Sequence, residues 1–277
     1  MTVRQGSRML YRRIVEVAAL AICSGAALAA APDGQTFKVF DGLLYRGKPD
    51  SSALGMTPII QVNSPAAANP IPHRVDDDAV RATLSTLHSY RGLVFLDYEF
   101  WPLNPASPGE LSNNIDMLNR VVRLAREVLP DATFGYYALL PCPDYWSIVG
   151  GDPAKFRAWQ TCNAALDVIA EHVDVILPSL YTYYYDQQGW DKFATAQLEA
   201  ARRYHKPVYA FLWPEFHISN PFLRGTNIPA GFWRHELEFC KAHADGIVIW
   251  GGWQKRWNEQ AAWWLETKAF LAGLSAP

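Results

Sequence analysis

The chain has 277 residues and a mass of 31.1 kDa; half of its residues are hydrophobic and 19% are charged. This composition supports a sizeable folded core and excludes a disordered protein. The 25 Lys and Arg residues against 27 Asp and Glu residues give a net charge of −2, so there is no basic excess to bind the phosphates of a nucleic acid. The 11 Trp and 13 Tyr residues suit a sugar-binding cleft, because flat rings pack on the apolar faces of sugars.

Residues 1–30 have the pattern of a secretory signal peptide. Several arginines precede an apolar run over residues 17–31, and Ala27-Leu28-Ala29 matches the small-residue pattern of a cleavage site. The run is short for a membrane span, and an uncleaved anchor is the alternative. We therefore expect an exported protein, secreted or periplasmic, with residues 31–277 as a single domain, no membrane span after cleavage, and a monomeric state.

From residue 91 onward, short apolar runs alternate with helical patterns. The runs are hydrophobic almost throughout, as expected of parallel strands that are covered on both faces. They span residues 93–100, 133–140, 174–183, 207–213 and 246–250, and residues 57–62 are the best candidate for an earlier strand. This alternation predicts an α/β fold, a (β/α) barrel of seven or eight strands of the distorted TIM-barrel type. An open doubly wound sheet is the alternative, although no G-x-G-x-x-G motif follows any strand.

Two acidic residues interrupt the apolar run over residues 93–100. Asp97 and Glu99 are two positions apart, so on a strand both side chains point to the same side, with about 7 Å between their Cα atoms. Carboxylates in an otherwise apolar strand are costly unless they face a functional cavity. Repulsion and partial burial raise the pKa of one such group, as a general acid requires. We therefore predict that both are catalytic; the alternative is a strand end with two surface acids.

The other predicted strands end in aromatic or hydroxyl residues. The carboxyl ends of the strands build the active site of a (β/α) barrel, so we expect these side chains to gather at one rim. Each aromatic residue alone is also compatible with core packing. The residues predicted to bind substrate are Trp101, Tyr136, Ser179, Tyr181, Trp213 and Trp250.

These segments resemble the hyaluronidase family of glycoside hydrolases, the animal and venom enzymes. The resemblance rests on GLVFLDYE at 92–99 with Trp101, GYY at 135–137 with Cys142, PSLY at 178–181, Trp213, and GIVIWG at 246–251. The segments occur in the family's order and at similar intervals over residues 91–253. The resemblance implies a distorted barrel of seven strands.

The resemblance also implies a reaction, the substrate-assisted cleavage of a β-linked N-acetylhexosamine in a glycan. The substrate's own acetamido oxygen attacks the anomeric carbon, Glu99 is the general acid/base, and Asp97 orients the acetamido group. Tyr181 and Ser179 are implied to form hydrogen bonds near that group, and Trp250 to wall its pocket.

The sequence departs from the family's pattern at several positions. Pro102 follows Trp101 where an Arg is usual, and Pro143 stands where an aromatic residue usually follows the motif cysteine. The segment before Asp97 is shorter than in the family. The resemblance therefore implies the fold and the acid more directly than it implies hyaluronan as the substrate.

Three cysteines follow the predicted signal peptide. Export permits disulfides, and a bridge between Cys142 and Cys162 would stabilise the fold by roughly 3 kcal/mol in the chain-entropy model. The residues alone leave this pairing open, because sequence does not fix the geometry of a bridge. The resemblance implies that the two correspond to a family disulfide. Cys240 lies in a helical pattern and is predicted to be a buried thiol.

Two other functions are alternatives. A retaining glycosidase would use Glu99 as the acid and Glu215, at another predicted strand end, as the nucleophile. A barrel that binds carbohydrate without turnover is the second, although a buried acid pair adds little to a binding module.

Metal or other cofactor chemistry is not predicted. The seven His residues are scattered, without H-E-x-x-H or H-x-H. Asp76, Asp77 and Asp78 are predicted to form the cap and first turn of a helix through Leu87 rather than a cation site, because acidic residues favour helix starts.

Overall fold

A computed structural model describes residues 36–63, 74–101, 103 and 108–275. The strands are β1 (Lys38–Leu43), β2 (Thr57–Pro58), β3 (Ile60–Asn63), β4 (Leu93–Asp97), β5 (Thr133–Tyr136), β6 (Tyr209–Leu212) and β7 (Gly246–Gly251). The helices are η1 (Ser52–Leu54), α1 (Asp77–Ser85), α2 (Pro108–Val128), α3 (Tyr145–Val149), α4 (Pro153–Ala164), α5 (Asp167–Ala170), α6 (Gln187–Arg202), α7 (Ala230–His243) and α8 (Ala262–Ser275). The predicted signal peptide lies outside the described residues. Within these described ranges, no helix has the length and apolarity needed to cross a membrane.

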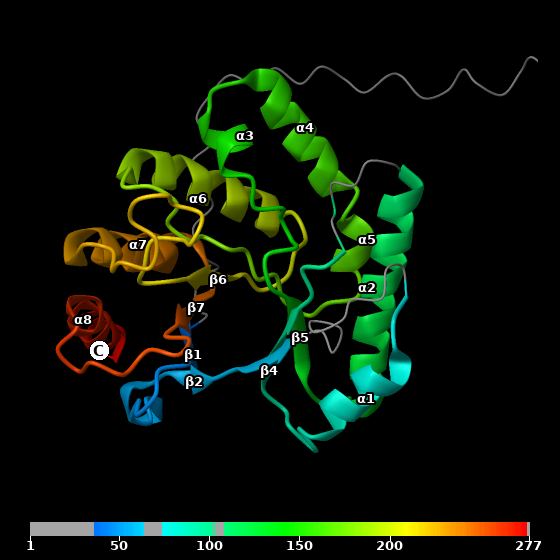
Figure 1. Cartoon of the computed structure of the whole chain (residues 1–277), viewed down its shortest axis with the longest axis horizontal. Coiled ribbons are helices and arrows are strands. Elements are labelled where there is room, and N and C mark those ends of the chain that lie inside the picture. Colours follow the sequence, from blue (N-terminus) through cyan, green and yellow to red (C-terminus); the bar gives the residue numbers. More distant parts are fainter. Residues whose placement is uncertain (1–35, 64–73, 102, 104–107, 276–277) are drawn as a thin grey trace, which may run out of the picture.

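All paired strands are parallel and belong to two sheets, with the orders β2-β1-β7-β6 and β3-β4-β5. Only Ile59 separates β2 from β3, so this stretch pairs with β1 at its start and with β4 at its end. Isolated parallel bridges tie residues 176–179 to β6 and to the residue after β5. The pairings thus run around a ring with helices outside it (Figure 1). This is the α/β barrel that the sequence predicts.

Alternate strand residues face the inside of this ring. Phe95 on β4 and Phe211 on β6 belong to different sheets, yet their ring centroids are 5.0 Å apart, so this contact crosses the interior. The same inner cluster contains Phe40, Leu93, Phe95, Val175, Leu177, Tyr181, Tyr209, Phe211 and Val248. Because side chains alternate along a strand, Asp97 lies on the same face as Phe95, at the carboxyl end of β4.

The predicted strands occur in the structure, but β4 ends at Asp97 and β5 at Tyr136 instead of at residues 100 and 140, so Glu99 lies in the turn after β4 rather than on the strand. Two further predictions differ from the structure. Residues 174–183 form only isolated bridges instead of a regular strand. β1 is not among the predicted strands, because Lys38 and Asp41 interrupt its apolar pattern. Its central place between β2 and β7 depends on pairing with distant segments, which local hydrophobicity does not reveal.

The prediction for the Asp76–Asp78 stretch is confirmed. The Asp76 side chain accepts the Ala79 N–H at 3.0 Å as the N-cap of α1, and Asp77 and Asp78 fill the first turn, where the helix dipole favours acids. The helix ends at Ser85, before the predicted end. Cys240 is fully buried in α7, also as predicted.

The disulfide that the resemblance implies between Cys142 and Cys162 is not present in the structure. Cys142 and Cys162 are free thiols whose Sγ atoms lie 3.6 Å apart, whereas a disulfide requires about 2.05 Å. The two sulfurs are in hydrogen-bond contact, and Cys162 Sγ also donates to the Leu103 carbonyl oxygen at 3.3 Å. The loop and α4 are therefore held together here by noncovalent contacts.

Candidate active site

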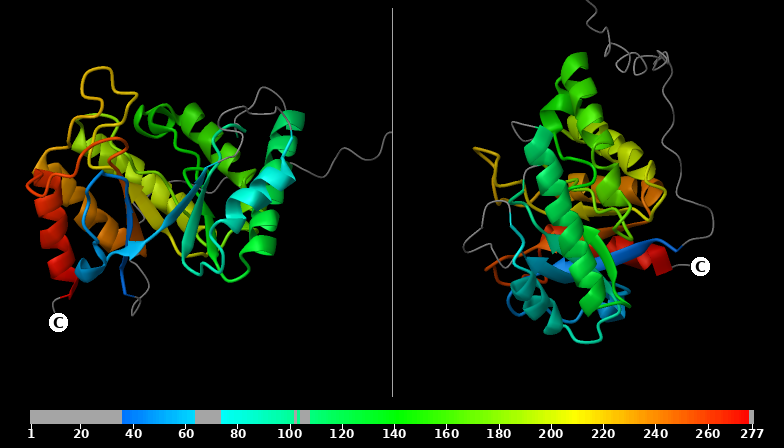
Figure 2. Two further views of the ribbon diagram at one scale, coloured as in Figure 1. Left: turned by 60° about the horizontal axis from the view of Figure 1, so that its bottom comes forward. Right: turned by 90° about the vertical axis from the view of Figure 1, so that its right-hand side faces the viewer.

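A cleft of about 490 Å³ opens at the carboxyl ends of the strands. The segments that follow β6 and β7 rise at this end of the barrel (Figure 2). Phe95 and Phe211 of the inner core contribute to its wall. The predicted site residues that line this cleft are Asp97, Glu99, Tyr181, Trp213, Glu215 and Trp250.

Asp97 and Glu99 form the acidic pair of the cleft. Partial burial, the negative charge of Asp97 and a hydrogen bond with Asp97 together raise the pKa of Glu99 to about 7. Glu99 as a whole residue is exposed, and its position in a cavity wall accounts for the desolvation of its carboxyl group. Gln61 on β3 donates from Nε2 to Asp97 Oδ2 at 2.8 Å, which fixes the second carboxylate. The pair thus contains a proton donor that stays protonated to near-neutral pH beside an oriented carboxylate.

Aromatic rings wall one side of the cleft. The rings of Tyr181 and Trp250 stack with centroids 6.0 Å apart and an interplanar angle of 28°. Trp213 meets Trp250 edge-on at 5.2 Å and Tyr181 at 5.4 Å. The Trp213 Nε1 atom is buried and has no hydrogen-bond partner among the described residues. This corner offers flat apolar surface of the kind that packs against a sugar ring or an acetamido methyl group.

Hydroxyl groups lie at the base of this wall. The Tyr137 hydroxyl is 3.4 Å from Ser179 Oγ, and its ring centroid is 5.8 Å from that of Tyr181. Burial raises the pKa of Tyr181 well above its ordinary value, and the nearby Tyr137 and Asp97 add to this shift. Both Tyr181 and Ser179 are buried. Tyr181 is therefore a neutral phenol that can donate a hydrogen bond next to Asp97.

Three predicted substrate-binding residues do not line this cleft: Ser179, which is buried beside Tyr137, and Tyr136 and Trp101, which lie elsewhere. Tyr136 is buried, and its hydroxyl donates to the Leu118 carbonyl oxygen of α2 at 2.7 Å, so it packs outside the ring. Tyr136 lies opposite Leu96 in the pairing of β5 with β4, and both side chains belong to the hydrophobic cluster between the strands and the helices. Tyr137 instead packs against the cluster inside the ring. Trp101 borders a second cavity, of about 550 Å³, which also has Glu99 in its wall.

Glu215 is buried and already bound on both oxygens. Its Oε2 atom is 2.6 Å from Lys255 Nζ, and the Tyr45 hydroxyl donates to Oε1 at 3.5 Å. Burial and then the nearby Glu215 charge raise the pKa of Tyr45, so that phenol stays protonated. Glu215 lines the cleft as predicted, but with its charge compensated.

Some residues that line this cleft or contact its acidic pair were missed by the sequence reasoning. Gln61 is a polar position within a predicted strand, and that was its only local signal. Tyr137 stands beside Tyr136 in the matched segment, and strand alternation alone does not say which of the two faces inward. His217 packs against Tyr183 with centroids 4.8 Å apart, and Lys255 approaches from beyond β7; neither carries a motif.

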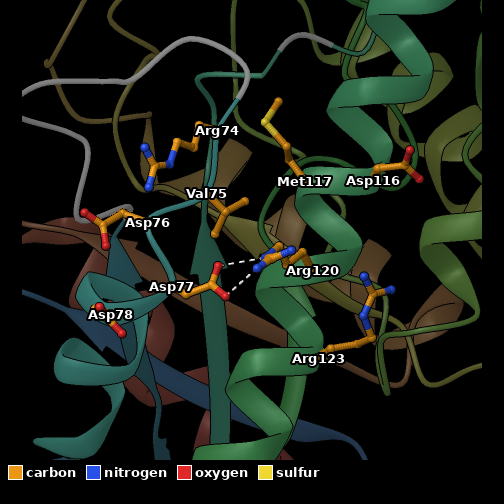
Figure 3. A pocket seen from close by; sticks show the side chains of 9 residues that line it. All are labelled: Arg74, Val75, Asp76, Asp77, Asp78, Asp116, Met117, Arg120 and Arg123. Carbon is orange, nitrogen blue, oxygen red and sulfur yellow. Dashed lines mark hydrogen bonds and ion pairs between the residues drawn. The ribbon is translucent and has the colours of Figure 1, made fainter.

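A further hollow, of about 590 Å³, lies between the start of α1 and the middle of α2 (Figure 3). It is lined by three arginines and four aspartates. Arg120 holds Asp77 through two hydrogen bonds of 2.7 and 2.5 Å, and Asp76 is occupied as the cap of α1 (Figure 3). Opposite charges on helix surfaces compensate one another here. This hollow therefore contains no acid pair comparable to Asp97 and Glu99.

Neither a protein-family model nor a curated protein matches the sequence. Among solved structures, the chain is similar to bee venom hyaluronidase, with 16% sequence identity and a TM-score of 0.63 over 86% of this chain and 95% of that chain. It is also similar to bee venom hyaluronidase in complex with a hyaluronic acid tetramer, with 15% identity and a TM-score of 0.61 over 86% and 94% of the two chains. At these identities the likeness shows the fold, a barrel of the kind found in glycoside hydrolases.

Proposed function

We propose that this protein is a glycoside hydrolase that cleaves a β-linked N-acetylhexosamine glycan by substrate-assisted acid/base catalysis. The observation that carries the proposal is the Asp97–Glu99 pair in an aromatic cleft, with the pKa of Glu99 raised to about 7. The fold supports it, since a bee enzyme of similar fold binds a tetramer of hyaluronic acid. Export, expected from residues 1–30, is part of the proposal, because a secreted or periplasmic enzyme meets polymeric glycans directly.

The proposed reaction has two steps. In the first, the acetamido carbonyl oxygen of the substrate forms a bond to the anomeric carbon while the glycosidic C–O bond breaks, and Glu99 gives its proton to the leaving oxygen. Asp97 accepts a hydrogen bond from the acetamido N–H and stabilises the positive charge of the cyclised group. In the second, water attacks the anomeric carbon, Glu99 takes up the water proton, and the ring opens with the anomeric configuration retained.

The aromatic corner gives this chemistry its preference for an acetamido group. Tyr181, protonated and buried, is proposed to donate to the acetamido oxygen, and the Trp250 ring that stacks on it is proposed to cover the acetamido methyl. Because Glu215 is bound to Lys255 and Tyr45, the substrate's own oxygen is a better nucleophile than this carboxylate. The alternative with two enzyme carboxylates is therefore less well supported.

A reducing-end assay tests the proposal. The protein is incubated with a panel of β-linked N-acetylhexosamine polymers, each supplied also in de-N-acetylated form, with and without a thiazoline mimic of the cyclised intermediate. We expect new reducing ends only from acetylated polymers and inhibition by the mimic. Equal release from both forms would reject the acetamido nucleophile. Binding without any new reducing ends would identify a carbohydrate-binding barrel instead.

A further inference from the structure

A loop at the mouth of the cleft holds large apolar side chains in water. This loop, residues 216–226, follows β6 and stands out from the carboxyl end of the barrel (Figure 2). Within it, Phe222 is 90% exposed and Ile218 is 66% exposed. Trp253, in the loop after β7, is also exposed, and it lines the same cleft as Ile218. Single exposed apolar residues are common, but a group of three at one rim marks an interaction site.

The loop after β6 has a fixed shape, so the exposure of Phe222 is a property of the fold. An antiparallel bridge between Glu215 and Asn227 closes the base of the loop. Inside the loop, the buried side chain of Asn220 accepts the Phe222 N–H at 2.9 Å and donates to the Tyr183 carbonyl oxygen at 2.7 Å. Because the loop is already ordered, covering its apolar side chains costs little further conformational entropy.

The same rim is basic. The loops after β6 and β7, residues 216–228 and 251–258, contain no Asp or Glu but three basic residues, Arg224, Lys255 and Arg256. Lys255 is bound to Glu215. Arg224 and Arg256 are exposed, and neither has an ion-pair partner among the residues that the structure describes. A chain with a net charge of −2 therefore carries two free guanidinium groups on the loops that expose its apolar side chains.

We propose that this rim surface, formed by Ile218, Phe222, Trp253, Arg224 and Arg256, binds an anionic lipid bilayer. Aromatic side chains are favoured at the level of the lipid headgroups, where an apolar ring meets both acyl chains and water. Basic side chains next to them are attracted to anionic headgroups. Apolar burial and electrostatic attraction together determine how strongly a protein binds to a membrane surface.

The shape of the rim favours a bilayer over a protein partner. A stable protein interface buries about 800 Å² on each side and requires a complementary surface. Here a single projecting loop carries the two most strongly exposed members of the rim surface, Phe222 and Ile218. The headgroup layer of a bilayer is soft and closes around such a loop without a matching surface.

Binding through the rim surface turns the cleft toward the membrane, because Ile218 and Trp253 also belong to the wall of the cleft. The glycans that reach the cleft first are then those attached to the membrane. The inference concerns lipid binding and does not depend on the proposed function.

Sedimentation with vesicles tests the inference. The protein is mixed at low ionic strength with vesicles of phosphatidylcholine alone or of phosphatidylcholine with phosphatidylglycerol. Phe222→Ser removes the apolar side chain that is most exposed, and Arg224→Gln removes one free charge. Val168→Ser is the matched control, since Val168 is an exposed apolar residue on α5, outside both loops. Thermal unfolding of each variant checks that the fold is intact.

We expect the wild type to sediment with the anionic vesicles. Phe222→Ser should weaken this binding at least tenfold, the scale of a lost buried aromatic side chain. Arg224→Gln should weaken it about fivefold and leave binding to neutral vesicles unchanged. Val168→Ser should stay within twofold of the wild type. Absence of wild-type binding, or Phe222→Ser that binds as the wild type does, would overturn the inference.

Two further measurements separate this inference from its alternatives. Light scattering that shows a wild-type dimer dissociated by Phe222→Ser, without vesicle binding, would identify the rim surface as an interface between two copies and reject the bilayer. Phe222 is not part of the cleft wall, so Phe222→Ser should cleave a soluble acetylated polymer with kcat/KM within twofold of the wild type. A wild type that binds anionic vesicles yet cleaves no polymer would refute the proposed function and leave the lipid-binding surface in place.

Discussion

The ammonium nitrogen of Lys255 lies 2.6 Å from Glu215 Oε2. The Glu215 side chain is almost fully buried, whereas that of Lys255 is 44% exposed. Lys255 also donates to the Gly225 carbonyl oxygen at 3.0 Å, and Tyr45 reaches the other oxygen of Glu215. The carboxylate thus joins segments that follow β1, β6 and β7. A carboxylate with this set of partners has a structural role at the rim of the cleft.

Glu215→Gln is therefore expected to reduce turnover by no more than about tenfold, the scale of a lost hydrogen bond outside the reacting centre. Stability should fall by about 1 kcal/mol, because the Lys255 that remains is accessible to water and keeps its hydration. Steady-state kinetics and denaturant unfolding measure the two effects separately.

Asp97→Asn is the counterpart substitution. An amide cannot compensate the positive charge of the cyclising acetamido group, so we expect kcat to fall at least a hundredfold. The free energy of unfolding should change little. The two-carboxylate mechanism predicts the reverse ranking, in which Glu215→Gln stops the reaction and Asp97→Asn is the milder change. Measuring both variants on one substrate separates the mechanisms.

Glu99→Gln should abolish turnover while retaining substrate binding. The change preserves shape and removes proton transfer, which contributes roughly 10²–10⁴ in rate. Binding of a non-cleaved oligosaccharide, followed by calorimetry, should remain near that of the wild type. Wild-type activity in this variant would show that the acid has been assigned to the wrong residue.

The pH profile provides a test of Glu99 without substitution. Its pKa is raised to about 7 by burial and by Asp97, so the protonated donor predominates below that pH and is lost above it. We expect kcat/KM to fall as pH rises through about 7. In Asp97→Asn the negative neighbour is gone, so the pKa of Glu99 decreases and the alkaline limb moves to lower pH. If the alkaline limb of the residual activity of Asp97→Asn lies at the same pH as in the wild type, Asp97 does not raise the pKa of Glu99.

The fold and the position of the acidic pair at the end of β4 could be predicted because their signals are local. Strand β4 is apolar on both faces, so Asp97 at its end and Glu99 two residues further on stand out. The Tyr136 prediction failed for a different reason: the segment Gly135-Tyr136-Tyr137 contains two candidates, and only the register with β4 decides which one faces inward. Gly135 marks that face in the structure, since a Cβ atom there would lie 2.7 Å from Leu177 Cδ1 inside the ring.

The remaining site residues depend on contacts between distant segments. Gln61 reaches Asp97 across 36 positions, and Tyr45 reaches Glu215 across 170. Neither residue type is unusual at its position, and no spacing rule connects them. These partners follow from strand order and register, which the sequence pattern of each strand does not specify.

Trp250 and Trp253 offer a matched pair of aromatic substitutions. Trp250 is stacked on Tyr181 inside the cleft, whereas the Trp253 side chain is 60% exposed at its edge. Trp250→Ala should lower kcat/KM on acetylated substrates at least tenfold more than Trp253→Ala does. Near-UV circular dichroism of both variants controls for packing, and equal kinetic losses would remove Trp250 from the proposed acetamido pocket.

Glu236 on α7 allows a prediction about stability. It is fully buried, it accepts the Thr182 hydroxyl on Oε1 at 2.5 Å, and its Oε2 atom has no partner among the described residues. Burial raises the pKa of Glu236 well above its ordinary value, and the charge of Asp191 adds to the shift, while the Thr182 hydrogen bond opposes it. The folded protein therefore holds this carboxyl group in its neutral form, in contact with Thr182, the residue after Tyr181.

A raised pKa in the folded state makes stability depend on pH in one direction. The favourable contribution is complete below the pKa of the unfolded chain, near 4.5, and is lost progressively as pH rises, at up to about 1.4 kcal/mol per pH unit. Glu236→Gln cannot ionise and retains a partner for Thr182. We expect it to match the wild type at pH 4 and to be more stable at pH 8, in denaturant unfolding at both values. Glu238→Gln, at an exposed position of the same helix, is the control and should show no such gain. A Glu236→Gln protein that loses the same stability at both pH values would show that the carboxyl group is ionised in the folded state.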